Sequence, residues 1–278
     1  MLLNISKLSI AGLALMSASA LASTTYANFG SVSDTGNNFN QFSVVKSGIN
    51  ITVSGWSDTE DMGNGNPLSG DDKITKAVDF DKNADGWSMT NSDEINTSNC
   101  GYHHSADNLG NKCGYQDYDM FLVEFSEAVN LSKATYSWIY NDGNSKNGNK
   151  VADNQVTVAA LSDKSLLGKD WGQVKNSQTM ASGYSQMQKS GGYYTNFTSA
   201  SSNVNGTFSR YWLIGALNSV FSSTDTSSLE GNDGFKLSGV SFTKGTPPPA
   251  TSVPEPTSIM MFGLALVGLF AANRRKIK

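Results

Sequence analysis

The segment Ile49-Asn-Ile-Thr-Val-Ser-Gly-Trp56 is the clearest strand signal in the chain, because its apolar and polar side chains alternate. Successive side chains of an extended chain point to opposite sides, so alternate residues share a face. The branched apolar residues fall on one face and the polar residues on the other: Ile49, Ile51 and Val53 against Asn50, Thr52 and Ser54. This period of two predicts a β-strand that buries one face.

Other short runs rich in β-branched and aromatic residues have the same character. Near the C-terminal end of this region, for example, Phe235 and Leu237 oppose Lys236 and Ser238. Asn-Gly and Asp-Gly pairs between the runs supply the positive-φ positions that tight turns need. The predicted strands are Phe42–Val45, Ile49–Trp56, Asp119–Phe125, Ala134–Tyr140, Gln155–Leu161, Tyr193–Phe197, Phe208–Ile214 and Phe235–Phe242.

These strands predict an all-β fold, namely an antiparallel two-sheet sandwich with a jelly-roll-like arrangement. Short helices are predicted at Ser162–Leu167 and Ala216–Phe221. A β-helix is the alternative architecture, but the chain has no repeat of fixed period. The predicted β-sandwich module spans residues 23–245 of the 278.

The charge balance excludes one broad class of function. The chain has 20 Lys and Arg against 24 Asp and Glu, for a formal net charge of -4. A protein that binds nucleic acid generally needs clustered basic residues to neutralise phosphates, so no nucleic-acid partner is expected. Hydrophobic residues make up 38% of the chain, which is too many for a disordered polymer.

The first 22 residues have the pattern of a secretory signal peptide. Leu8–Ala22 is an apolar run interrupted only by small residues, and it follows Lys7. Ala20 and Ala22 occupy the two positions that signal peptidase recognises, so cleavage is expected before Ser23. The alternative is an N-terminal membrane anchor, for which the apolar run is short against a hydrocarbon core of about 30 Å.

The C-terminal end has three parts. Residues 246–256 form a proline-rich tether, because proline fixes φ and removes a backbone donor. Residues 257–272 are apolar and predict a short transmembrane helix, and residues 273–278 are a basic tail with Arg274, Arg275 and Lys276. Basic residues stay on the cytoplasmic side, so the module before the helix is expected across the membrane.

Pro254, Glu255 and Pro256, followed by an apolar helix and a basic tail, resemble the PEP-CTERM sorting signal of Gram-negative bacteria. The resemblance implies that an exosortase recognises this triplet, cuts the chain near it and delivers the body to the cell surface or exopolysaccharide. It also implies a transient membrane-held intermediate in the periplasm. A plain membrane anchor with a proline stalk is the alternative.

Asp81-Lys-Asn-Ala-Asp-Gly86 is the best candidate for a metal site, and the metal expected there is calcium. Oxygen side chains at alternating positions before a glycine can curl around Ca²⁺. Asp81, Asn83 and Asp85 resemble the first ligands of an EF-hand loop, but Ser92 stands where the loop needs glutamate. The alternative is a β-turn rich in Asp, Asn and Gly that needs no metal.

No catalytic motif is evident, so the expected function is a non-enzymatic one at the cell surface or in the extracellular matrix, where the protein would associate with a biofilm or exopolysaccharide. The first alternative is a carbohydrate-binding or adhesive module. It would need exposed aromatic residues along one groove, with Tyr102, Tyr115, Tyr193 and Tyr194 as candidates. The second alternative is a secreted hydrolase with two carboxylates in a cleft.

Cys100 and Cys113 are the only cysteines, and export would take them to an oxidising compartment. We therefore predict a disulfide between them, which would stabilise the fold by about 3 kcal/mol. Zinc bound with His103 and His104 is the alternative, but adjacent histidines rarely chelate one ion. The intact mass of the native protein should be lower by two hydrogens than that of the reduced protein; equal masses would contradict the bridge.

Overall fold

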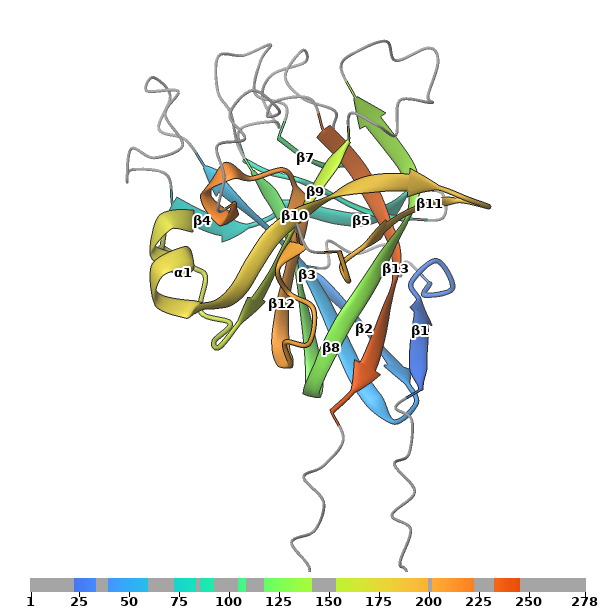
Figure 1. Ribbon diagram of the computed structural model, residues 1–278. Helices are drawn as coiled ribbons and strands as arrows, with labels where there is room; N and C mark the ends of the chain where they lie inside the picture. The colour runs from blue at the N-terminus through green and yellow to red at the C-terminus, as the bar shows by residue number, and fades with distance from the viewer. Residues whose placement is uncertain are drawn as a thin grey trace, which may run out of the picture.

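The computed structural model describes residues 23–33, 40–59, 73–83, 86–92, 105–108, 118–141, 154–199, 202–222 and 233–245 (Figure 1). Within these ranges, thirteen strands join in one sheet and every strand pairing is antiparallel. The strands are β1 (Thr24–Asn28), β2 (Gln41–Lys46), β3 (Ile49–Thr59), β4 (Lys73–Lys76), β5 (Asp79–Asn83), β6 (Gly86–Thr90), β7 (Ala106–Asp107), β8 (Asp119–Asn141), β9 (Gln155–Leu161), β10 (Thr179–Lys189), β11 (Tyr193–Asn196), β12 (Ser209–Ala216) and β13 (Asp233–Lys244).

Strand β8 is the longest, with 23 residues, and it is bent into two arms that meet at the lower end of Figure 1. Residues 119–125 pair with β3 on one edge and β12 on the other. Residues 129–141 pair with β13, and part of this arm also pairs with β11. Tyr211 of β12 pairs with Glu124, but Ser209 pairs with Val129, so several residues of β8 between these positions have no partner in β12. An irregularity of this kind bends a strand and changes its direction.

The bend in β8 allows the sheet to close on itself. Strand β12 pairs with β9, β9 with β10, β10 with β11, and β11 returns to the second arm of β8. The result is a barrel-like ring. The predicted all-β class and antiparallel pairing are therefore confirmed, whereas a sandwich of two separate sheets with jelly-roll order is not, because the described strands are continuous in one sheet.

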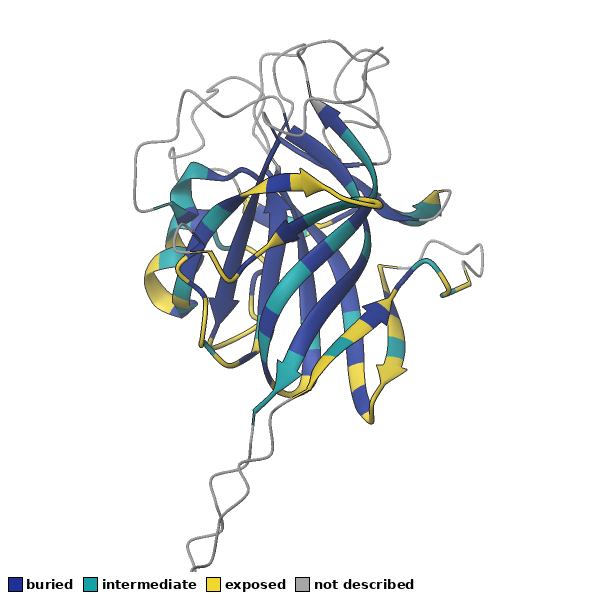
Figure 2. Cartoon of the chain, turned by 45° about the vertical axis from the view of Figure 1, so that its right-hand side comes forward, coloured by how far each residue is buried: buried dark blue, intermediate teal, exposed yellow. Residues whose placement is uncertain are grey.

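The main hydrophobic core joins residues of the ring strands to residues of β1, β2, β3 and β13, which are not ring strands. On β3, Ile49, Ile51 and Val53 are all 0% exposed, as their alternation predicts. Aromatic rings pack closely at one side of the core, where the centroids of Phe42 and Trp87 lie 4.1 Å apart in a stacked arrangement. Figure 2 shows that buried positions dominate the central strands.

A second hydrophobic cluster covers part of the outer face of the sheet. It includes Leu161 and Leu213 from the sheet and Trp171 and Val174 from helix α1 (Trp171–Gln178). The helix begins with a capping box, in which the Asp170 carboxylate accepts the backbone N–H of Gln173 at 2.7 Å. This cluster holds the segment before α1 against the sheet.

Buried polar side chains join strands that are distant in the sequence. The Asp58 carboxylate accepts the backbone N–H of Tyr118 at 2.7 Å, next to the start of β8. The Asp233 carboxylate accepts the backbone N–H of Gln155 at 2.9 Å, at the start of β9. A hydrogen bond from a backbone N–H to an ionised carboxylate is stronger than one between neutral groups, so these aspartates help to position the strand ends.

All eight predicted strands lie within strands of the structure, apart from one or two residues at their ends, and the range of β9 matches its prediction. The prediction missed β1, β10 and the short strands β4 to β7. Ser162–Leu167 is not helical, and only the 3-10 turn η4 (Ser219–Phe221) lies in the second predicted helix. In the first segment, Asp163 instead accepts the backbone N–H of Ser165, which favours a local turn.

Gly215 marks the close approach of β12 to β8. A Cβ atom at this position would lie 2.5 Å from the carbonyl oxygen of Asp119 and 2.7 Å from Cγ of Met120. We predict that Gly215→Ala lowers the free energy of unfolding by about 1–3 kcal/mol, because the backbone must shift. Urea denaturation followed by fluorescence measures the change.

Gly172→Ala in α1 is the control, since the nearest atom to its added Cβ would be 3.1 Å away, on the Asp170 side chain. This change should alter the unfolding free energy by less than about 1 kcal/mol. Equal stability of Gly215→Ala and the unsubstituted protein would contradict the packing of β12 on β8.

Candidate functional site

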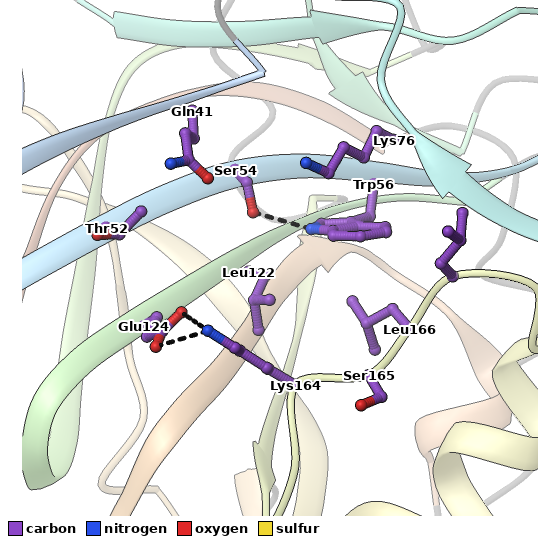
Figure 3. A pocket seen from close by; sticks show the side chains of 11 residues that line it. Gln41, Thr52, Ser54, Trp56, Lys76, Leu122, Glu124, Lys164, Ser165 and Leu166 are labelled. Carbon is purple, nitrogen blue, oxygen red and sulfur yellow. Dashed lines mark hydrogen bonds and ion pairs between the residues drawn. The ribbon is translucent and has the colours of Figure 1, made fainter.

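A pocket of about 390 Å³ lies on the outer face of the sheet, where β3 and β8 are neighbours (Figure 3). Thr52, Ser54 and Trp56 reach it from β3, and Leu122 and Glu124 from β8. These residues alternate with buried core residues, so their strands direct them away from the ring. The remaining lining residues are Gln41, Lys76, Lys164, Ser165, Leu166 and Leu167.

The floor of this pocket is apolar and rigid. Leu122 and Leu166 are buried, and the Trp56 side chain is only 8% exposed. The indole N–H of Trp56 donates to Ser54 Oγ at 2.8 Å, which satisfies the one polar atom of the ring and fixes its orientation. The pocket therefore offers a preformed hydrophobic surface that a bound molecule need not reorganise.

The wall of the pocket contains charged groups of both signs. Lys164 Nζ contacts both carboxylate oxygens of Glu124 at 3.0 Å, and Figure 3 shows this ion pair at one side of the pocket. At the other side, Lys76 Nζ lies 5.8 Å from the centroid of the Trp56 ring. An aromatic and aliphatic floor with hydrogen-bonding groups at its rim is typical of a site for a polar ring compound.

A second pocket, of about 520 Å³, lies between the turn after β10 and the segment after β1. Tyr136, Ser137 and Tyr193 line it, together with Gly30 and Gly192. Tyr136 is only 3% exposed, and burial raises the pKa of its hydroxyl far above the ordinary value. This tyrosine is therefore neutral over the physiological pH range and cannot act there as a base.

The two described tyrosines among those predicted for an aromatic groove, Tyr193 and Tyr194, do not share a face. Tyr193 and Tyr194 are neighbours on β11, so they face opposite sides of the sheet. Tyr193 packs against the main core, and Tyr194 lies beneath Lys133 Nζ, 4.1 Å from its ring centroid. Tyr102 and Tyr115 lie outside the described residues.

The two described calcium candidates, Asp81 and Asn83, lie on β5, which pairs with β6. Asn83 pairs with Gly86, and Asp81 accepts a hydrogen bond from Ser88 Oγ at 2.8 Å. Burial lowers the pKa of Lys236, and its attraction to Asp81 opposes this shift. Asp85 lies outside the described residues. Among the described residues, no group of three or more His, Cys, Asp and Glu side chains is arranged to bind a metal.

Several predicted functional residues lie outside the described part of the chain. They are the disulfide pair Cys100 and Cys113, the sorting triplet Pro254, Glu255 and Pro256, and the basic residues Arg274, Arg275 and Lys276, as well as the signal peptide. The described ranges contain no helix of sufficient length and apolar character to span a membrane. The predicted transmembrane segment 257–272 is not among them.

Comparison with known proteins identifies the C-terminal segment. Residues 252–276 match the family model of the PEP-CTERM protein-sorting motif. No curated protein and no solved structure matches the chain. The match includes the triplet at 254–256, the apolar segment and Arg274 to Lys276.

Residues 252–276 are therefore a PEP-CTERM sorting motif, which supports an exported protein that an exosortase targets. Such a motif implies export and a membrane-anchored intermediate before exosortase cleavage. The exosortase is thus the partner that the motif identifies.

The pocket of Figure 3 was not predicted from the sequence, because its lining residues are far apart along the chain. They come from β2, β3, β4, β8 and the segment after β9. A partial signal was present in the sequence. The polar face predicted for Ile49–Trp56 contains Thr52 and Ser54, and Trp56 follows them on the same face.

The segment around Asp81 can be interpreted as a calcium-binding loop or as a turn without metal. The effect of calcium on thermal stability distinguishes the two interpretations. If Asp81, Asn83 and Asp85 bind the ion, thermal unfolding should occur at higher temperature in calcium than in chelator, by an amount that corresponds to about 2.7 kcal/mol at 100 times Kd. Asp81→Asn should remove this difference. Asp163→Asn, an exposed aspartate of another segment, is the control and should retain it. Superimposable melting curves for the unsubstituted protein would exclude the calcium interpretation.

Proposed function

We propose that this chain is a non-enzymatic cell-surface or extracellular-matrix protein, which an exosortase processes through residues 252–276. The single observation on which the proposal rests is the match of these residues to the sorting motif. In this proposal the β module, residues 23–245, remains together with its proline-rich tether after the signal peptide and the segment beyond the triplet are removed. It is retained with extracellular polysaccharide.

The arrangement of the two ends of the sheet supports this proposal. Thr24 of β1 pairs with Thr243 of β13, so the described chain begins and ends side by side (Figure 1). The tether that starts at residue 246 therefore leaves the module next to the expected mature N-terminus. A module held in this way would direct its opposite end away from the membrane.

Three of the described acidic side chains have surroundings that support the proposed non-enzymatic role. A secreted hydrolase that breaks glycosidic bonds typically needs two carboxylates facing one cleft. Among the described residues that line the pocket of Figure 3, Glu124 is the only carboxylate, and Lys164 pairs with it. Asp58 and Asp233 are buried and accept backbone N–H groups, which is a structural role.

Carbohydrate binding is the second candidate function, and the pocket of Figure 3 favours it. Trp56, Leu122 and Leu166 present an apolar floor against which the C–H face of a sugar ring can pack. Gln41 and Thr52 add hydrogen-bonding groups at the rim. Binding of this kind would explain retention in a polysaccharide matrix without a covalent attachment.

Replacement of Pro254, Glu255 and Pro256 by alanines tests the sorting role. We expect the variant to keep its C-terminal tail, because the exosortase would lack the recognition triplet. Mass spectrometry of the C-terminal peptide in exosortase-positive and exosortase-negative strains measures processing. The matched control replaces Pro247, Pro248 and Pro249, which lie outside the matched motif, and it should be processed normally. Normal processing of the first variant would refute the proposal.

A further inference from the structure

The proposed function leaves one feature of the outer pocket unexplained, the ammonium group of Lys76. This residue ends strand β4, pairs with Trp56 in the sheet and is exposed. Its contact in the described part of the chain is with the Trp56 ring, and no described carboxylate lies within ion-pair distance of it. Because Glu124 is engaged by Lys164, the described residues that line the pocket carry one positive charge in excess.

This local charge has the opposite sign to that of the whole protein. The chain has a formal net charge of -4, so its general field does not attract anions. Within this pocket, the Lys76 ammonium is therefore a local positive charge and not part of an extended basic surface. It can select a negatively charged group where the neighbouring floor also fits.

The rest of the pocket limits which anion would fit. The apolar floor favours a ligand with a hydrophobic face, which a free inorganic anion lacks. Gln41, Thr52 and Ser165 provide neutral hydrogen-bonding groups that suit hydroxyls. A volume of about 390 Å³ lies within the range of small-molecule sites. A ring with hydroxyls, an apolar face and one carboxylate has all of these properties.

We propose that this pocket binds a uronate residue of an acidic polysaccharide, with the carboxylate at Lys76 and the sugar ring over Trp56, Leu122 and Leu166. The inference rests on the proposed retention with extracellular polysaccharide and names the class of glycan that the module retains. The Glu124–Lys164 ion pair lies at the opposite side of the pocket and has no formal net charge, so Lys76 is the group that attracts the ligand carboxylate.

Binding of polygalacturonate to the purified mature protein tests the proposal, with dextran as the uncharged polymer. Isothermal titration calorimetry at low salt should show binding of polygalacturonate and not of dextran. Lys76→Met keeps an unbranched side chain without the charge and should weaken binding by about tenfold. Lys46→Met removes an exposed lysine of β2 that does not line the pocket, and binding should be unchanged.

Glu124→Gln is a second variant, and it tests the role of the ion pair. It should strengthen binding, because it leaves Lys164 without its carboxylate partner and so adds a second positive charge to the pocket. Monomeric galacturonate should compete with the polymer, whereas acetate at the same concentration should not. Competition by acetate to the same extent would show a general carboxylate site and would overturn the assignment to a sugar acid.

Three further results would overturn the inference. They are equal affinity of Lys76→Met and the unsubstituted protein, equal binding of dextran and polygalacturonate, and absence of binding to either polymer. In each of these cases, normal removal of the C-terminal tail would leave the sorting proposal standing. Failure of tail removal together with Lys76-dependent binding would refute the sorting proposal alone.

Discussion

The fold depends on strand β8 being paired along both edges of each arm. Its first arm lies between β3 and β12, and its second arm between β13 and β11. Because both edges are occupied, neither arm can pair with the other, and the bend near Ser126 must carry the chain from one side of the ring to the other. Loss of this bend would open the ring and expose the main core, so the bend is a requirement of the architecture.

The pairing of β8 also explains where the outer pocket forms. Once β3 and the first arm of β8 lie side by side, the period of two sends Val53 and Val123 into the core and Thr52 and Leu122 to the outer face. The second hydrophobic cluster then holds Leu166 against that face, where it forms part of the floor of the pocket. Lys76 lies at one side of the pocket, because β4 pairs with the end of β3.

Much of the sheet could be predicted from the sequence, since strands such as β3 and β9 have strong alternation or many β-branched residues. Strand β10, in contrast, contains two Ser, two Gln, two Met and one Gly, so its intrinsic β-propensity is low. Its pairing with β9 is what stabilises it. The closure of the ring and the pocket depend on contacts between distant segments, which periodicity does not encode. The sorting motif was evident because its three parts are contiguous.

The account depends above all on the chain being exported at one end and processed at the other. The most direct measurement is the intact mass of the native protein together with the compartment in which it is found. We expect a chain outside the cytoplasm that begins at Ser23 and has lost the residues after the Pro-Glu-Pro triplet. A cytosolic protein that retains both Met1 and Lys278 would contradict the account.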